Sequence, residues 1–317
     1  MYRATHRSEN AHEEGIWSVG WTEADNILSG SVDERARVWT PELAPVHSLN
    51  GHRLGVLSVR SFNQGKGEQF FPAQHHARFS FSIDSCIRFW DLESGEQTAI
   101  EEPGPVEAWT LAVSKDDKLL ASGTQKGSVN LWALDGHKKV ASIETRDKFV
   151  MSVAFSPNNK LLASGGLDGY VNIFDVEQKK LDQKLEGHAM PIRSLCFSSD
   201  GSLLFTASDD MRVNVYDVKN TSLVASFTGH TSWVLSVDCC SDGRHFATGG
   251  SDQTVKIWDM AAKECVHTFD SAHNNQVCLP HGSTPKKSCR VNQRRFFLLL
   301  GLILWKHVFK CVRHQCR

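Results

Sequence analysis

The stretch that decides the fold covers residues 187–259 and reads GHAMPIRSLCFSSDGSLLFTASDDMRVNVYDVKNTSLVASFTGHTSWVLSVDCCSDGRHFATGGSDQTVKIWD. It contains one unit twice. Each copy begins with Gly-His, continues through short apolar strands separated by a turn of Ser, Asp and Gly, and ends on an aromatic residue followed by Asp. Corresponding residues lie 42 positions apart, as His188 and His230 show. A fixed period of this length is typical of an array of small β units.

The same unit extends towards the N-terminus. Strands alternate with turns rich in Gly, Asp, Asn and Ser, a pattern that predicts antiparallel four-stranded sheets, and helical periodicity is absent. The aromatic residue that closes each unit recurs once after 51 residues and four times after 42, at Trp39, Trp90, Trp132, Phe174, Tyr216 and Trp258. We therefore expect an all-β protein with six recognisable repeats.

The polar residues of these repeats resemble those of a known family. The Gly-His opening, an Asp six residues before the closing aromatic, and the endings Trp90-Asp91 and Trp258-Asp259 are similar to WD repeats. The resemblance covers about residues 11–277 and implies a β-propeller of the seven-bladed kind. Only the start of a seventh repeat is recognisable, so the last blade is expected to be incomplete. We expect the propeller to comprise residues 1–277 and a divergent tail to comprise residues 278–317.

Four segments resemble one particular member of the WD-repeat family. They read AWTLAV from residue 108, KFVMSVAFSP from 148, EGHAMPIRSL from 186 and WVLSV from 233. They are similar to the WD-repeat subunit of the superkiller (Ski) RNA-surveillance complex, which in animals is also found in the Paf transcription-elongation complex. The resemblance implies a scaffold that binds a large tetratricopeptide-repeat subunit and assembles with an RNA helicase, in the nucleus and the cytoplasm.

A buried hydrogen-bonded tetrad is expected in most repeats. In complete WD repeats a His, a Ser or Thr, the turn Asp and the closing aromatic form this chain. The fourth unit has Phe174 at its end and Arg146 at the His position, and the third has Lys126 where Asp belongs. The matching sets are His12, Ser29, Asp33 and Trp39; His52, Ser80, Asp84 and Trp90; His188, Thr206, Asp210 and Tyr216; and His230, Thr248, Asp252 and Trp258.

These His, Ser and Asp residues do not predict a hydrolase. A nucleophilic site needs one exposed Ser beside a base and an oxyanion hole, whereas this set recurs in four units. No phosphate-binding glycine loop, HExxH, GxSxG or paired CxxC motif is present. We expect no enzyme, no cofactor and no metal.

Partner binding is expected on the face where the chain enters each repeat. Large aromatic and Arg side chains are common anchors at interfaces, although each could instead pack into its own blade. The candidates, which the spacing places at comparable points of successive repeats, are Trp17, Trp109, Phe149, Arg193 and Trp233.

Composition favours an intracellular protein that does not bind nucleic acid directly. The net charge of -1 conceals an acidic body, because residues 278–317 hold nine basic and no acidic side chains. An acidic surface does not suggest nucleic-acid binding. The N-terminus lacks an apolar signal segment, and the nine scattered cysteines fit a reducing compartment.

Three stretches depart from the repeat pattern. Residues 1–10 offer few residues for a strand that would close the ring. Residues 63–78 form an insertion, which is either a binding loop, with His75-His76 as a possible metal contact, or an irregular segment. The tail contains an apolar run at 296–305 that is too short to span a bilayer; it is either a membrane-surface anchor or the altered C-terminus of an isoform.

Two other functions compete with the superkiller assignment. A ubiquitin-ligase substrate receptor would be favoured by an Arg soon after a Trp-Asp pair, but Leu92-Glu93 and Met260-Ala261 stand there. A membrane-associated variant held by its apolar tail is the other alternative. The tail would then be needed for membrane binding.

Overall fold

The computed structural model describes the chain from the first repeat to the end of the sixth. The residues described are 8, 11–22, 26–61, 77–82, 86–101, 109–145, 149–240 and 242–270. Residues 1–10 apart from residue 8, most of the 63–78 insertion and the whole tail lie outside this set, so the expectations about them stay predictions.

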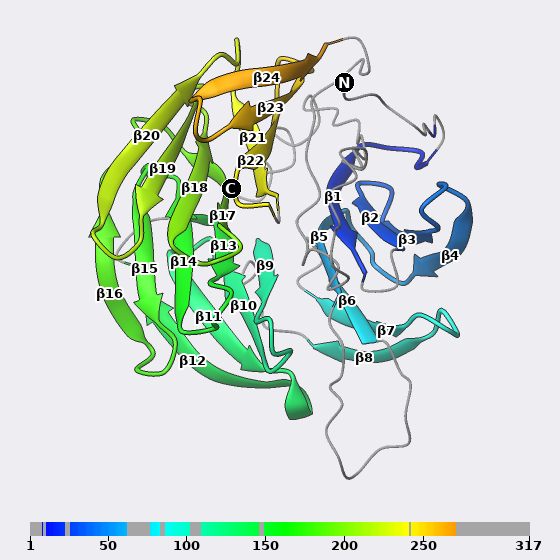
Figure 1. The fold of residues 1–317 in the computed structure, drawn as a ribbon. Coiled ribbons are helices and arrows are strands. Elements are labelled where there is room, and N and C mark those ends of the chain that lie inside the picture. The colour runs from blue at the N-terminus through cyan, green and yellow to red at the C-terminus, as the bar shows by residue number, and fades with distance from the viewer. Residues whose placement is uncertain are drawn as a thin grey trace, which may run out of the picture.

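Six antiparallel four-stranded sheets follow one another around a ring (Figure 1). Each sheet is built from four consecutive strands, with the first innermost and the fourth outermost. The first three sheets contain β1 (Ile16–Trp21), β2 (Ile27–Ser31), β3 (Arg35–Trp39), β4 (Pro45–Asn50); β5 (Val56–Ser61), β6 (Ala77–Ser82), β7 (Ile87–Asp91), β8 (Gln97–Glu101); β9 (Thr110–Val113), β10 (Leu119–Gly123), β11 (Ser128–Ala133) and β12 (Lys138–Glu144). The last three contain β13 (Val150–Phe155), β14 (Leu161–Gly166), β15 (Val171–Asp175), β16 (Lys180–Leu185); β17 (Ile192–Phe197), β18 (Leu203–Ser208), β19 (Arg212–Asp217), β20 (Ser222–Thr228); β21 (Val234–Cys239), β22 (His245–Gly250), β23 (Val255–Asp259) and β24 (Glu264–Phe269).

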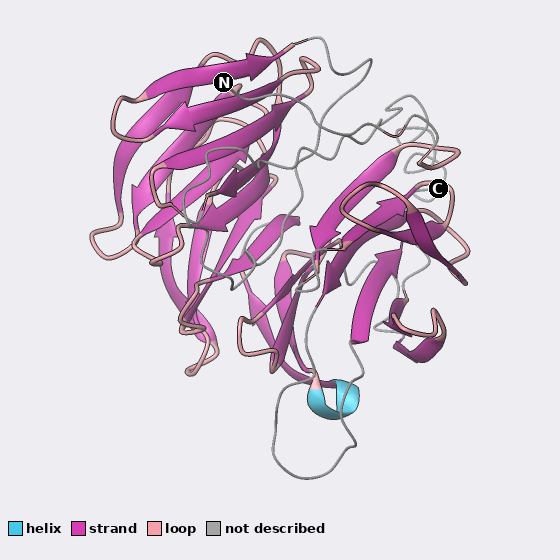
Figure 2. Ribbon diagram, turned by 45° about the vertical axis from the view of Figure 1, so that its right-hand side comes forward, coloured by secondary structure: helices cyan, strands magenta, loops and turns pink. Residues whose placement is uncertain are grey.

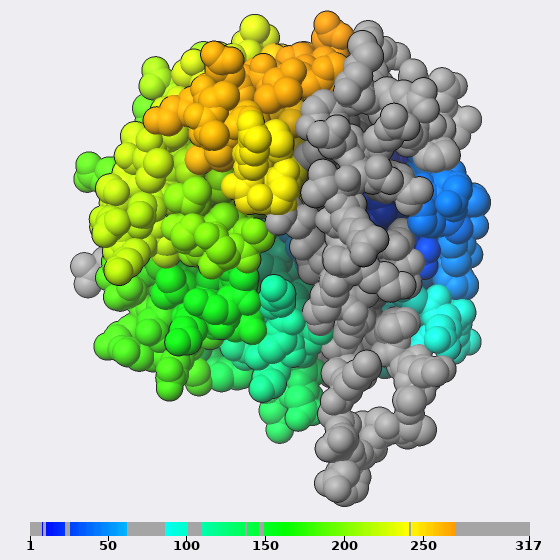
Figure 3. Space-filling view, in the orientation of Figure 1, coloured from blue at the N-terminus to red at the C-terminus, as the bar shows by residue number. Residues whose placement is uncertain are grey.

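The all-β prediction is confirmed. All six closing aromatic residues lie in the third strand of a sheet and are buried. Six sheets, not seven, are present among the described residues, and the stretch in which a seventh would continue, 271–317, is outside them. Figure 3 shows the same succession on the surface, from the blue first sheet through green to the orange end of the sixth.

Neighbouring sheets are joined through their inner strands. A serine of one inner strand accepts a hydrogen bond from a backbone N–H of the next: Ser18 Oγ from Val59 at 3.1 Å, and Ser194 Oγ from Val237 at 3.2 Å. Five of the six clusters of buried side chains draw on two neighbouring sheets, as Phe205 and Phe246 do with ring centroids 5.0 Å apart; the sixth lies within the first sheet. Stability is therefore built from contacts between adjacent sheets.

Glycine at the end of a second strand allows this close approach. A Cβ added to Gly165 would lie 2.6 Å from Ile192 Cγ2 on the next inner strand, and one added to Gly123 would lie 2.6 Å from Val150 Cγ1. Real Cβ atoms essentially never come so close. The missing side chain thus sets the spacing between the sheets.

Helix is almost absent from the structure (Figure 2). Within the described ranges it is confined to the 3-10 turn η1 (Asp135–His137), three residues long. Accordingly, the described part of the chain has no helix of the length and apolarity that crossing a membrane requires.

Candidate functional site

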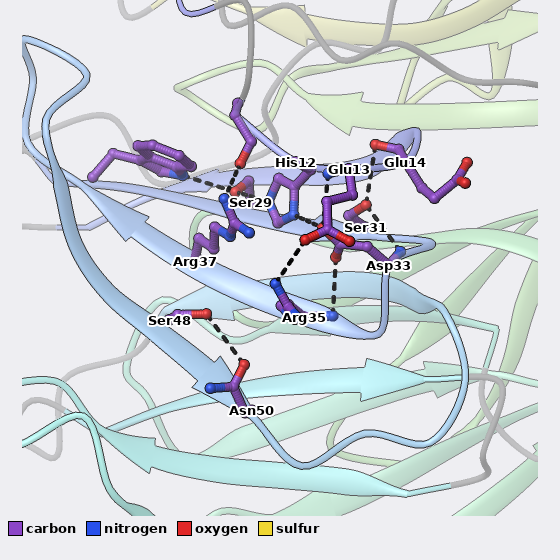
Figure 4. A network of polar contacts seen from close by, with 12 residues as sticks. His12, Glu13, Glu14, Ser29, Ser31, Asp33, Arg35, Arg37, Ser48 and Asn50 are labelled. Carbon is purple, nitrogen blue, oxygen red and sulfur yellow. Dashed lines mark hydrogen bonds and ion pairs between the residues drawn. The ribbon is translucent and has the colours of Figure 1, made fainter.

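The tetrad of the first sheet is a continuous hydrogen-bonded chain. The ring of His12 lies between Ser29 and Asp33 (Figure 4), with Nε2 2.7 Å from Ser29 Oγ and Nδ1 2.8 Å from Asp33 Oδ2. Trp39 Nε1 donates to the same Ser29 Oγ at 2.8 Å. The chain therefore ties the segment before β1 to the turn between β2 and β3.

The sixth sheet repeats this geometry. His230 Nδ1 lies 2.8 Å from Asp252 Oδ2, His230 Nε2 lies 2.7 Å from Thr248 Oγ1, and Trp258 Nε1 donates to Thr248 at 2.8 Å. Thr248 is fully buried. Its hydroxyl thus serves two buried ring nitrogens at once.

The fifth sheet adapts the chain to a tyrosine. His188 contacts Asp210 at 2.7 Å and Thr206 at 2.8 Å. The Tyr216 hydroxyl accepts a hydrogen bond from Asn214 Nδ2 at 3.2 Å, and burial raises the pKa of Tyr216. The polar end of the aromatic residue is therefore satisfied by a different partner.

The third and fourth sheets keep only fragments of the chain. Trp132 Nε1 donates to Ser122 Oγ at 3.0 Å, but Lys126 is exposed in the turn. In the fourth sheet Phe174 has no donor, and Ser164 Oγ is buried without a hydrogen-bond partner. In the second sheet His52 and Trp90 are buried, whereas the side chains of Ser80 and Asp84 lie outside the description.

The turn carboxylates are held ionised. Burial alone would raise the pKa of Asp33, Asp210 and Asp252, but hydrogen bonds and charge from the paired His, together with backbone N–H donors, bring each below its ordinary value. A lowered pKa contributes stability above about pH 4 that is lost as pH falls. These carboxylates and their buried partners therefore stabilise the fold.

A second set of side chains lies on one face of the ring. We call this face the entry face. It consists of the segment that leads into each inner strand and of the turn between the second and third strands of the same sheet. The Val32 N–H donates to Gly15 O at 3.0 Å, and in the sixth sheet the Ser251 N–H donates to Trp233 O at 2.8 Å. Equivalent bonds, from Leu167 N–H to Phe149 O and from Asp209 N–H to Pro191 O, hold segment and turn together in the fourth and fifth sheets.

The five predicted anchors all lie on or beside this face and are all partly buried. They do not share one register position, as the spacing had suggested. Trp17 and Arg193 are the extra residues at irregularities in β1 and β17, and Trp109 lies two repeat periods before Arg193. Phe149 and Trp233 stand two residues earlier in their own repeats. β13 and β21 have the same irregularity, at Met151 and Leu235, so Phe149 and Trp233 precede it whereas Trp17 and Arg193 are part of it.

The two positions meet across the boundaries between sheets. Trp109 of the third sheet packs edge-on against Phe149 of the fourth, with ring centroids 4.9 Å apart. Arg193 of the fifth sheet lies over the ring of Trp233 of the sixth, 5.8 Å from its centroid. A Cβ added to Gly55 of the second sheet would lie 3.4 Å from Trp17. The structure thus brings four of the five anchors together as two pairs, while Trp17 stands apart.

Arg193 is fixed by a carboxylate. Its Nε donates to Asp209 Oδ1 at 2.8 Å and its Nη2 to Asp209 Oδ2 at 2.6 Å. The Asp209 side chain is 3% exposed and that of Arg193 is 21% exposed. A bidentate pair of this kind fixes the orientation of the guanidinium plane.

Exposed apolar residues between these pairs were not predicted from the sequence. Leu167 and Met211 lie in the turns of the fourth and fifth sheets, and Met190 lies in the segment before β17; they are 44–46% exposed. An apolar residue inside an Asp-rich turn, as in LDG at 167–169 and DDM at 209–211, is the signal that could have found them. They extend the apolar part of the entry face across the fourth and fifth sheets.

The described residues offer little for catalysis by a metal. No group of three or more His, Cys, Asp and Glu side chains in the described ranges is arranged to hold a metal ion. His75 and His76 lie outside those ranges, so the metal interpretation of the insertion is untested.

Comparisons with known proteins agree with the geometry. The WD domain, G-beta repeat model matches residues 5–40, 179–217 and 221–259, and the model of the anaphase-promoting complex subunit 4 WD40 domain matches residues 111–190. The chain is 40% identical over 139 residues to WD repeat-containing protein SL1-17 of Schistosoma mansoni and 39% identical over 130 residues to WD repeat-containing protein VIP3 of Arabidopsis thaliana. These alignments cover 41% and 39% of this chain, but only 43% and 37% of the two relatives.

Four-stranded antiparallel sheets that follow one another around a central axis define a β-propeller. Each sheet here has a buried aromatic residue in its third strand. The hydrogen-bonded His–Ser/Thr–Asp–aromatic chains and the matched repeat models indicate that the propeller is of the WD-repeat type. This chain is a WD-repeat protein.

Proposed function

We propose that this chain is a non-catalytic scaffold that assembles a protein complex through its entry face. The observation that carries the proposal is the pair of contacts Trp109–Phe149 and Arg193–Trp233, which place partly exposed aromatic and guanidinium groups on one face. Such groups supply much of the binding energy at protein interfaces. The His, Thr and Asp side chains, by contrast, are committed to buried structural contacts.

The complex we propose is the superkiller RNA-decay complex, with a second role in the Paf transcription-elongation complex. The partner at the entry face is then a short segment of the tetratricopeptide-repeat subunit, and the RNA helicase joins the same assembly. The four segments beginning at residues 108, 148, 186 and 233 support this assignment. All four lead into inner strands, and each contains one anchor, which is Trp109, Phe149, Arg193 or Trp233 in turn. The protein would act in both nucleus and cytoplasm.

Binding of the purified tetratricopeptide subunit to the full chain tests this proposal. Trp233→Ala removes an anchor and its contact with Arg193, and should weaken binding by at least ~10-fold in Kd, as expected for an interface hot spot. Leu223→Ser is the matched control, because Leu223 is 54% exposed on the outer strand β20 of the fifth sheet, away from the entry face.

Circular dichroism and thermal unfolding establish that both variants are folded. Equal binding by wild type and Trp233→Ala would show that the entry face is not the docking site. Failure of the wild type to bind the tetratricopeptide subunit, or the helicase assembly that contains it, would instead refute the assignment to the superkiller complex.

A further inference from the structure

Two thiols meet at the boundary between the fifth and sixth sheets. Cys196 lies on β17 and Cys239 at the end of β21, and their Sγ atoms are 2.9 Å apart. Cys196 is 7% exposed, and Cys239 is more accessible. The two sulfur atoms are therefore in direct contact across neighbouring strands.

The backbone holds this contact in register. Two residues before each cysteine, the Val237 N–H donates to Ser194 Oγ at 3.2 Å and joins the same two strands. This bond fixes the spacing of the two strands beside the cysteines. A disulfide requires Cβ atoms about 3.5–4.5 Å apart, and sulfur atoms already in contact between the inner strands of adjacent sheets are close to that geometry.

The pair is specific to this boundary. At the positions 42 residues earlier stand Ala154 and Phe197, and 84 residues earlier stand Ala112 and Phe155. At the boundaries between the third, fourth and fifth sheets, these positions therefore hold a small alanine and a large phenylalanine. Two residues of equal size and with reactive sulfur replace that combination only between the fifth and sixth sheets.

We propose that Cys196 and Cys239 form a dithiol site that a peroxide converts into a disulfide bond, which fastens the sixth sheet to the fifth. The Cys239 sulfur attacks one oxygen of the peroxide; an S–O bond forms, the O–O bond breaks, and water leaves when hydrogen peroxide is the oxidant. The Cys196 sulfur then displaces the hydroxyl group as a second water, and the S–S bond forms. Two thiols and one hydrogen peroxide give one disulfide and two waters.

Accessibility sets the order and the rate of these steps. Cys239 reacts first because it is the more exposed of the two. Burial raises the pKa of both thiols, and the neighbouring Cys196 and Asp238 raise that of Cys239 further, so the thiolate fraction is small and the reaction is slow. The site therefore responds to sustained oxidant rather than to a brief pulse.

The disulfide would restrain the last described sheet. The core of the sixth sheet, including Phe246 and Trp258, forms one cluster with the fifth sheet. A covalent link between residues 43 apart in sequence restricts the unfolded chain and adds to this contact. Oxidation should raise the midpoint of thermal unfolding by about 5 °C or more.

Peptide mapping of the full chain after treatment with hydrogen peroxide tests the proposal. Trypsin releases Cys196 in residues 194–212 and Cys239 in residues 220–244, and the disulfide joins them with the loss of two hydrogens. The linked peptide should form in wild type, disappear on reduction with dithiothreitol and be absent from Cys239→Val. Valine stands at the matching position of the third sheet, as Val113.

Cys240→Ser is the matched control, because Cys240 shares the second peptide and serine stands at its position in three other sheets, as Ser114, Ser156 and Ser198. This variant should still form the link and show the thermal shift. Cys196→Ala, which restores the alanine of the earlier boundaries, gives an independent test if Cys239→Val fails to fold. Oxidation of the exposed Cys265 without the linked peptide, or a link that depends on Cys240, would overturn the proposal.

Discussion

At the scale of single residues, the tetrads indicate how much one buried hydroxyl group contributes to the free energy of unfolding. Thr248→Val keeps the side-chain volume but leaves the ring nitrogens of His230 and Trp258 without their shared partner. Each stranded buried group costs about 1–3 kcal/mol, so the free energy of unfolding should fall by about 2–4 kcal/mol in urea titrations.

The fourth sheet supplies the control. Ser164 stands at the same repeat position as Thr248, but its buried Oγ has no hydrogen-bond partner. Ser164→Ala should therefore leave the unfolding free energy unchanged or raise it slightly. Equal losses in the two variants would mean that the hydroxyl contributes through packing alone.

A second prediction at this scale concerns pH. Burial raises the pKa of Asp238 on β21 to about 7, against hydrogen bonding from Cys239 N–H and the charge of Arg60. The unfolded carboxyl ionises near pH 4, so the folded state binds more protons between about pH 4 and pH 7, and this group lowers stability as pH rises through that range. Asp238→Asn removes the cost.

The variant should gain about 2 kcal/mol relative to wild type at pH 8, after allowance for the partial exposure of the side chain, and little at pH 4. Chemical unfolding at several pH values measures this difference. A constant difference between the two proteins across the range would show that the folded carboxyl ionises with an ordinary pKa.

At the scale of strands and sheets, glycine determines how closely neighbours pack. Gly165→Ala would place its Cβ 2.6 Å from Ile192 Cγ2, and the inner strand β17 would have to move. Overpacking of this kind costs about 1–3 kcal/mol, which thermal unfolding detects. The fifth sheet has Ala207 at the matching position. Unchanged stability of Gly165→Ala would therefore show that the fourth sheet can accommodate a Cβ atom there as the fifth sheet does.

The strands were predictable because their signal is periodic. The 42-residue interval and the closing aromatics locate every sheet, and the tetrads of the first, fifth and sixth sheets follow from residue type at fixed spacing. The pairing of Arg193 with Trp233 was not predictable, since it depends on a bulge in β17 and on the position of the next sheet. A one-residue irregularity has no signature in composition, yet it decides which side chains meet.

At the scale of the whole molecule, stability is carried by contacts between neighbouring sheets. Five of the six apolar clusters involve adjacent sheets, and the inner strands pack in succession from β1 to β21. In such an array the loss of one end affects chiefly its nearest neighbours. The propeller predicted for residues 1–277 should therefore survive removal of residues 278–317.

A chain ending at Val277 should unfold cooperatively and bind the tetratricopeptide subunit with the Kd of the full chain, because the anchors at the third to sixth sheet boundaries are retained. Thermal unfolding and binding of the two chains, side by side, measure both properties. Any loss of stability should be local, because in such an array a sheet contacts chiefly its neighbours, and should leave the Trp109–Phe149 contact in place. Aggregation of the shorter chain under conditions in which the full chain is monomeric would mean that residues 278–317 belong to the folded domain, since an uncovered sheet edge invites association.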